Sequence, residues 1–261
     1  MTLIVTYINR HGIIHASDSN LTNSNDENAG SGQKTFAINY LNAGMTVAGS
    51  YSVGGIHMDV WLNDFIPKQE FVKGITLEKF SRALKDELQA KMTASEKEGG
   101  SMIHIAGYVE ANGKVHPEFW FITNVHGMNE QTGEYENVDE TFGISEDFWN
   151  RDCQRGNIMA AFKNENIFSR AHYFNGFSSG RMGYHALTRE LEKFFLELWR
   201  VPGWKFRPPK SLDDTERLVK LYMQIITELF VLSDYPARYI GGGIQTFKIP
   251  QPANIVDECI A

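Results

Sequence analysis

Three polar residues near the start of the chain, Thr2, Asp18 and Lys34, are of types that together could break an amide bond. A threonine hydroxyl is a poor nucleophile until a base removes its proton, and a threonine at the amino terminus carries that base as its own α-amino group. The pKa of a free α-amine is about 7.7 to 8.0, which suits a general base at neutral pH. We expect Thr2 to be this nucleophile once Met1 is removed, and the small side chain of Thr2 makes Met1 a suitable substrate for methionine aminopeptidase.

The other two residues could tune such a nucleophile. Lys34 beside the amine would lower the amine's pKa by like-charge repulsion and help to stabilise a threonine alkoxide, while Asp18 would hold the lysine in place. Equal intervals separate Thr2 from Asp18 and Asp18 from Lys34. Taken singly, an aspartate at a strand end is usually a turn former, and a lysine before an apolar strand is usually a solvated edge charge. The joint spacing favours the catalytic interpretation.

A predicted hairpin would position the first two of these residues. Segments 3–8 and 13–17 are rich in β-branched and apolar residues, so we expect two strands that begin just after Thr2 and end just before Asp18. The polar stretch 19–33 that follows has no hydrophobic periodicity, and we expect it to be a loop able to rim a cleft.

The rest of the chain predicts further strands and two pairs of helices. Strand patterns cover 34–39, 45–49, 102–109, 116–125 and 238–249. Helical patterns cover 56–66, which Pro67 should end, 77–92, 182–199, and a segment from Ser211 with Leu218, Tyr222, Ile225, Leu229 and Leu232 as its apolar stripe. This order is not the strict alternation of a parallel α/β protein. We expect an α+β fold in which two antiparallel sheets lie between helix pairs.

The composition of the 261 residues excludes several function classes. A formal net charge of −7 leaves no basic footprint for nucleic-acid phosphates. The two cysteines lie far apart and the eight histidines form no metal-binding motif, so we expect no disulfide framework, no metal and no cofactor. No stretch approaches the ~18 apolar residues of a membrane span, and no basic segment of a signal peptide precedes residues 3–5. We expect a cytoplasmic protein that binds neither nucleic acid nor membrane.

Several runs within residues 2–66 occur together in one known pattern. They are Thr2, the run H-G-I-I-H-A-S-D-S at 11–19, K-T-F-A-I at 34–38, and Ala48-Gly49. Together they resemble the amino-terminal third of a proteasome β-subunit and of the related bacterial ring proteases. The resemblance is architectural as far as about residue 125 and weak over 126–210. It implies the four-layer αββα sandwich of the N-terminal nucleophile hydrolases, as a single domain over 1–261 with an insertion or elaboration around 146–204.

The same resemblance implies a role for each matching residue. In that family the terminal threonine attacks while a lysine and an aspartate tune it, which gives these roles to Thr2, Lys34 and Asp18. The backbone N–H of Gly49 would help to bind the oxyanion, a match that needs a one-residue insertion, and a strand-end glycine is the competing interpretation. Ser179 would hydrogen-bond near the terminal amine, with an ordinary helix N-cap as its competing interpretation.

The resemblance also implies a substrate pocket and includes one departure. Leu21, Phe36 and Val47 would line an apolar specificity pocket. Segment 241–244 resembles the family's late double-glycine strand, but the Asp-x-x-Ser before those glycines is replaced by Arg-Tyr-Ile-Gly at 238–241. The departure falls in the family's proton-handling network.

Three functions remain open on the sequence. The first is a threonine peptidase that cleaves amide bonds through an acyl-enzyme on Thr2, assembled as a homo-oligomeric ring with an ATPase as a possible partner. The second is a non-catalytic shell or scaffold subunit with the same fold, and the third is a small-molecule amidase. Peptides longer than the cleft rim would discriminate the peptidase from the amidase.

Overall fold

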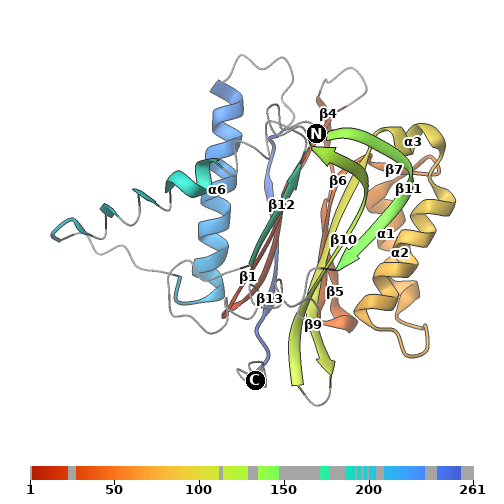
Figure 1. Cartoon of the computed structure of the whole chain (residues 1–261), viewed down its shortest axis with the longest axis horizontal. Helices are drawn as coiled ribbons and strands as arrows, with labels where there is room; N and C mark the ends of the chain where they lie inside the picture. The colour runs from red at the N-terminus through yellow and green to blue at the C-terminus, as the bar shows by residue number, and fades with distance from the viewer. Residues whose placement is uncertain are drawn as a thin grey trace.

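Two antiparallel β-sheets lie face to face at the centre of the molecule, with helices on both outer sides (Figure 1). The computed structural model describes residues 2–22, 28–111, 114–128, 135–146, 171–176, 186–191, 193–194, 197–198, 200–203, 209–232 and 240–253. The α+β class and the antiparallel sheets expected from the sequence are confirmed. Of the described helices, none is long and apolar enough to cross a membrane.

The first sheet has the strand order β12-β1-β2-β13 and contains the amino-terminal strand. Its strands are β1 (Leu3–Asn9), β2 (Gly12–Asp18), β12 (Ala171–Gly176) and β13 (Ile244–Pro250). The predicted β1–β2 hairpin is therefore present. At its turn Gly12 has a φ of +146°, and a Cβ there would lie 2.3 Å from the carbonyl oxygen of Ile249. Glycine at this position lets β13 pair closely with β2.

The second sheet has the strand order β11-β10-β9-β6-β5. Its strands are β5 (Thr35–Ile38), β6 (Ala43–Gly49), β9 (Ser101–Ala111), β10 (Lys114–Met128) and β11 (Tyr135–Glu146). The predicted strands at 34–39, 45–49, 102–109 and 116–125 correspond to β5, β6, β9 and β10. A 3₁₀ turn, η1 (Asn39–Leu41), joins β5 to β6.

Helices cover the outer face of each sheet, so the layers run helix, sheet, sheet, helix (Figure 1). The helices α1 (Met58–Gln69), α2 (Leu77–Lys91) and α3 (Ala94–Glu98) lie on the second sheet. The helix α6 (Leu212–Leu232) lies on the first sheet. Its buried residues pack with those of β1 and β2 that point the same way, including Leu3, Val5, Tyr7 and Ile14. Successive strand residues face opposite sides, so Ile4 and Thr6 point toward the second sheet.

Three local expectations were wrong. Segment 19–33 is not an irregular loop throughout, because β3 (Asn20–Thr22) pairs there with β4 (Asn28–Ser31). Strands this short show no readable alternation. The first helix begins at Met58, because Ile56–His57 form strand β8 with β7 (Ser52–Val53). The helix also continues past Pro67 to Gln69, although a proline there cannot donate the intrahelical hydrogen bond to the carbonyl four residues earlier.

The predicted apolar stripe of α6 was wrong at its carboxyl-terminal end, whereas Leu218 packs against the core and Ile225 is partly buried. Tyr222 is buried as expected, but Leu229 and Leu232 are 50% and 80% exposed. The buried face instead consists of Thr215, Val219, Tyr222, Met223 and Ile226. Apolar residues occur on several sides of this helix, so periodicity alone fits more than one face.

The range 146–204, which the sequence assigns to an insertion, contributes one strand to the first sheet. Strand β12 pairs with β1 from Leu3 opposite Gly176 to Ile8 opposite Ala171. Residues 186–191 are helical, and Leu187 and Leu191 pack against the core beneath α6. Most of the remaining range lies outside the described residues.

Candidate active site

Thr2, Asp18 and Lys34 meet at one end of the sandwich. Thr2 immediately precedes β1, Asp18 is the last residue of β2, and Lys34 immediately precedes β5. The Lys34 ammonium Nζ donates a hydrogen bond of 2.5 Å to Thr2 Oγ1 and lies 3.5 Å from Asp18 Oδ2. All three residues are buried, with relative exposures of 4%, 0% and 1% in chain order. The structure thus brings together the three residues that the sequence selects.

Strand pairing explains why the three residues meet. In the β1–β2 hairpin Ile4 lies opposite Ser17, so Asp18 at the end of β2 reaches the start of β1. The Ser17 and Thr35 hydroxyls lie 3.0 Å apart between the two sheets. This contact holds the start of β5, and therefore Lys34, against the end of β2.

Backbone amides surround the Asp18 carboxylate. Its Oδ1 accepts a hydrogen bond from the N–H of Leu3 at 3.0 Å, and its Oδ2 accepts from Asn20 at 3.2 Å and Gly241 at 3.3 Å. Burial raises the pKa of Asp18, whereas Lys34 and the amides act in the opposite direction. The donors therefore favour the ionised form in a site with little water.

The ammonium group of Lys34 contacts three acceptor groups. Besides Thr2 and Asp18, it donates to the carbonyl oxygen of Asn20. Burial lowers the pKa of Lys34, and Asp18 opposes that shift. A desolvated ammonium that donates to the Thr2 hydroxyl would stabilise negative charge developing on Oγ1. Removing either charged partner would leave the other buried without its counter-ion.

Gly49 lies near the same end of the molecule. It ends β6, and its neighbour Ala48 packs against Ile4 of β1 and Met102 of β9. Its φ is +98°, and a Cβ there would lie 2.1 Å from the carbonyl oxygen of Gly100. This position therefore needs glycine for steric reasons, whatever its chemical role.

The other predicted site residues differ in their burial. Phe36 and Val47 are buried in the core cluster that includes α1 and α2, with 2% and 3% exposure. Leu21 is only partly buried, on β3. Ser179 lies outside the described residues, three positions after Gly176 at the end of β12.

Contacts that the sequence did not predict come mainly from residues 240–243, just before β13. Ile240 is 3% exposed in the apolar core, and the N–H of Gly241 donates to Asp18. The Ser19 hydroxyl accepts from the N–H of Gly243 at 2.9 Å. Backbone donors leave no signature in residue types. Gln245 on β13 also contacts this region, because its side chain bonds the backbone of Gly32 and Lys34.

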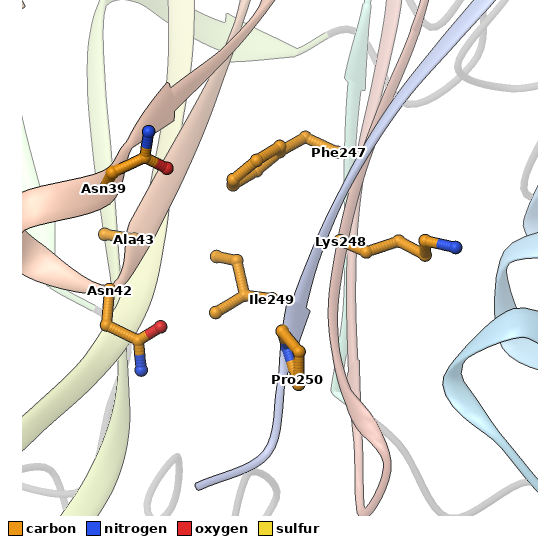
Figure 2. A pocket seen from close by; sticks show the side chains of 7 residues that line it. All are labelled: Asn39, Asn42, Ala43, Phe247, Lys248, Ile249 and Pro250. Carbon is orange, nitrogen blue, oxygen red and sulfur yellow. The ribbon is translucent and has the colours of Figure 1, made fainter.

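A pocket at the other end of the sandwich is separate from this cluster. It has a volume of about 220 Å³ and lies between the turn after β5 and the end of β13. Figure 2 shows Asn39, Asn42 and Ala43 on one side, facing Phe247 and Ile249, while the Lys248 side chain points away. Pro250, also in the lining, pairs with Gly12 at the opposite end of β2 from Asp18.

The chain has no match among models of known protein families or among curated proteins. In the part of the chain that the structure describes, no group of three or more His, Cys, Asp and Glu side chains could hold a metal ion.

Proposed function

We propose that this protein is an N-terminal threonine hydrolase with the proteasome β-like form of the N-terminal nucleophile hydrolase fold. The observation that carries the proposal is the 2.5 Å hydrogen bond from Lys34 Nζ to Thr2 Oγ1, backed by Asp18 at 3.5 Å. The order of helix, sheet, sheet and helix layers supports it. The proposal requires Thr2 to be the first residue of the active chain, because an acylated amine cannot accept a proton.

The reaction would proceed in two halves. The free α-amine of Thr2 takes the hydroxyl proton, and Oγ1 attacks the carbonyl carbon of the substrate amide while Lys34 stabilises the negative charge on Oγ1. The backbone N–H of Gly49 would donate to the oxyanion, a contribution of about 3 to 4 kcal/mol in comparable sites. The protonated α-amine of Thr2 then gives this proton to the departing amine as the substrate C–N bond breaks, which leaves an ester on Thr2. Water, deprotonated by the same amine, hydrolyses the ester and restores the hydroxyl.

A peptide is the substrate class that we favour, and a homo-oligomeric ring is the assembly that we favour. Both come from the sequence resemblance over residues 2–66 and go no further than that resemblance does. A small-molecule amidase would use the same Thr2 chemistry but would reject peptides that extend beyond the cleft rim. Turnover of a series of peptides of increasing length distinguishes the two.

Labelling by a peptidyl epoxyketone tests the mechanism, because this reagent reacts with a hydroxyl and a free amine on one residue. We expect the intact mass to lack Met1 and to increase by one adduct. Thr2→Ala should take no adduct and show no peptide turnover, and Lys34→Ala should lose about two to three orders of magnitude in rate. Thr141→Ala and Lys73→Ala, at exposed positions, serve as matched controls. Full activity in Thr2→Ala or Lys34→Ala would overturn the mechanism.

A non-catalytic shell subunit is the second candidate, and the segment before β13 favours it. Ile240 is buried in the apolar core in the stretch where the resembling family has its Asp-x-x-Ser. A chain that retains Met1 and takes no adduct would support this second function. A chain that loses Met1 but takes no adduct would count against peptidase activity with this reagent's specificity.

A further inference from the structure

The segment that delivers Lys34 to Thr2 is neither helix nor strand. Residues 32–34 lie between β4 and β5, and contacts from other elements hold their backbone. The N–H of Gly32 donates to the carbonyl oxygen of Ser19 at 3.0 Å, and the carbonyl oxygen of Lys34 accepts from Val47 at 2.9 Å. The Tyr51 hydroxyl donates to the carbonyl oxygen of Gln33 at 2.5 Å. The position of Lys34 therefore depends on these surroundings rather than on a regular element.

One side chain binds this backbone at two points. The Oε1 atom of Gln245 on β13 accepts a hydrogen bond of 2.7 Å from the N–H of Lys34. Its Nε2 donates a hydrogen bond of 2.7 Å to the carbonyl oxygen of Gly32. One amide thus pairs with a donor and an acceptor two residues apart, as the N–H and C=O of one residue in a neighbouring parallel strand would.

The position of Gln245 connects this contact to the rest of the cluster. It follows Ile244, which pairs with Asp18 across the β13–β2 ladder. Three residues before Ile244, Gly241 donates its N–H to the Asp18 carboxylate. Strand β13 thus holds Asp18 through its backbone and the Lys34 segment through a side chain.

We propose that Gln245 is a positioning residue for Lys34, holding Nζ at the Thr2 hydroxyl. This inference rests on the proposed threonine hydrolase function and adds a residue that does not touch substrate. Only an amide of this length supplies both the acceptor for Lys34 N–H and the donor for Gly32 carbonyl. Without it the contacts with Ser19, Val47 and Tyr51 remain, but β13 no longer holds the Lys34 N–H. The Lys34 backbone can then shift relative to β13, and Nζ shifts with it.

The test uses three variants of the full chain. Gln245→Met keeps the length and bulk of the side chain but removes both hydrogen bonds. Gln245→Glu keeps an acceptor for the Lys34 N–H and loses the donor to Gly32. Gln33→Met is the matched control, because Gln33 is in the same segment but its amide donates to Thr35 carbonyl at 3.1 Å instead.

Peptide hydrolysis separates positioning from a purely structural role. We expect kcat of Gln245→Met to fall roughly ten- to a hundredfold, because a displacement of about 1 Å can lower the rate by this much in other active sites. KM should change by less than about twofold. Gln245→Glu should recover part of that loss and Gln33→Met should match the wild type. An unchanged kcat in folded Gln245→Met would overturn the proposal. If Gln245→Met does not fold, a wild-type kcat in Gln245→Glu does the same.

A second measurement does not depend on turnover. The pKa of Lys34 can be followed by the ¹³Cε shift of labelled lysine, assigned with Lys34→Arg. Because burial lowers this pKa, freeing the segment should let it rise toward the ordinary value in Gln245→Met. If the wild type hydrolyses nothing but this shift occurs, the proposed function fails while the positioning contact stands. If the wild type is active and the Lys34 pKa does not move, the positioning proposal alone fails.

Discussion

Two polar clusters lie along strands β1 and β2, one containing charged side chains and the other neutral side chains. The terminal cluster, Thr2, Asp18 and Lys34, contains a pair of opposite charges at the strand ends. The central cluster, Thr6, His15, His104 and Asn175, lies between the sheets at mid-strand. There Thr6 Oγ1 lies 3.0 Å from His15 Nδ1 and 3.2 Å from His104 Nδ1, and His104 Nε2 lies 2.7 Å from Asn175 Oδ1.

The difference follows from where backbone donors are free. At the end of β2 the sheet ladder stops, so N–H groups of Leu3, Asn20 and Gly241 can turn toward the Asp18 carboxylate. At mid-strand the backbone N–H and C=O groups are already paired in the sheet ladder. Side chains there can hydrogen-bond only to one another or to the second lone pair of a carbonyl oxygen. Burial lowers the pKa of His15 to about 4 and that of His104 to about 3, which keeps both rings neutral at pH 7. Thus this fold places a charged site at the strand ends and a neutral polar layer behind it.

The largest expected effect comes from breaking the charged pair. Asp18→Asn and Lys34→Met should each destabilise the protein by about 3 to 5 kcal/mol, because each leaves one buried charge without its partner. The double variant removes both charges, so we expect it to lose less than the sum of the two singles by about 1 to 3 kcal/mol. Urea unfolding at pH 7 measures all three.

The exposed pair Asp64 and Lys68 on α1 supplies the control. Their side chains are 65% and 66% exposed, so Asp64→Asn and Lys68→Met should each change stability by less than about 1 kcal/mol. Additive effects of Asp18→Asn and Lys34→Met would contradict the interpretation of the terminal cluster as a mutually dependent ion pair.

The central cluster should respond to acid, with an effect of intermediate size. The pKa values of His15 and His104 are lower in the folded chain, about 4 and 3, than the ordinary 6.5. Between pH 6.5 and about pH 4 the unfolded chain therefore binds more protons than the folded chain, and the free energy of unfolding falls as the pH falls. The slope is about 1.4 kcal/mol per pH unit for each histidine.

Replacing one ring isolates this effect. His104→Gln should lower the pH dependence of the unfolding free energy between pH 6.5 and 5 by about one proton, whatever its effect on stability at pH 7. His126, 43% exposed at its side chain on β10, provides the comparison variant His126→Gln. Equal slopes in wild type and His104→Gln would show that the His104 ring is protonated in the folded state.

The sequence predicted the terminal cluster better than the central one for a physical reason. Asp18 and Lys34 stand at the ends of clear apolar runs, so their positions relative to Thr2 follow from a hairpin and a second strand. His15 and His104 come from different sheets, and which strands face one another depends on packing that periodicity does not encode. Gln245 illustrates the same limit, because its partners Gly32 and Lys34 are distant in sequence and bind through backbone atoms.

The fold shows a similar division. Strands with strong alternation or tight turns, such as β1, β2, β9 and β10, were predicted close to their actual bounds. The helix face of α6 was not, because Leu229 and Leu232 satisfy the same apolar spacing as residues that are actually buried. Strands β3 and β4 were missed because polar residues can pair through their backbones without any hydrophobic pattern.

The smallest expected effect tests whether the two clusters are independent. The Thr6 hydroxyl can donate to only one of the two histidine Nδ1 atoms and must accept from the other, so the neutral rings carry their protons on different nitrogens. Thr6→Val keeps the shape but removes both bonds, and it should cost about 1 to 3 kcal/mol in urea unfolding. Thr141→Val, at an exposed position on β11, should stay within about 0.5 kcal/mol of the wild type. Because Thr6 and Asp18 share no hydrogen-bond partner among the residues that the structure describes, the double variant Thr6→Val with Asp18→Asn should be additive within about 0.5 kcal/mol. A larger coupling would mean that the neutral layer and the charged site act as one network along β1.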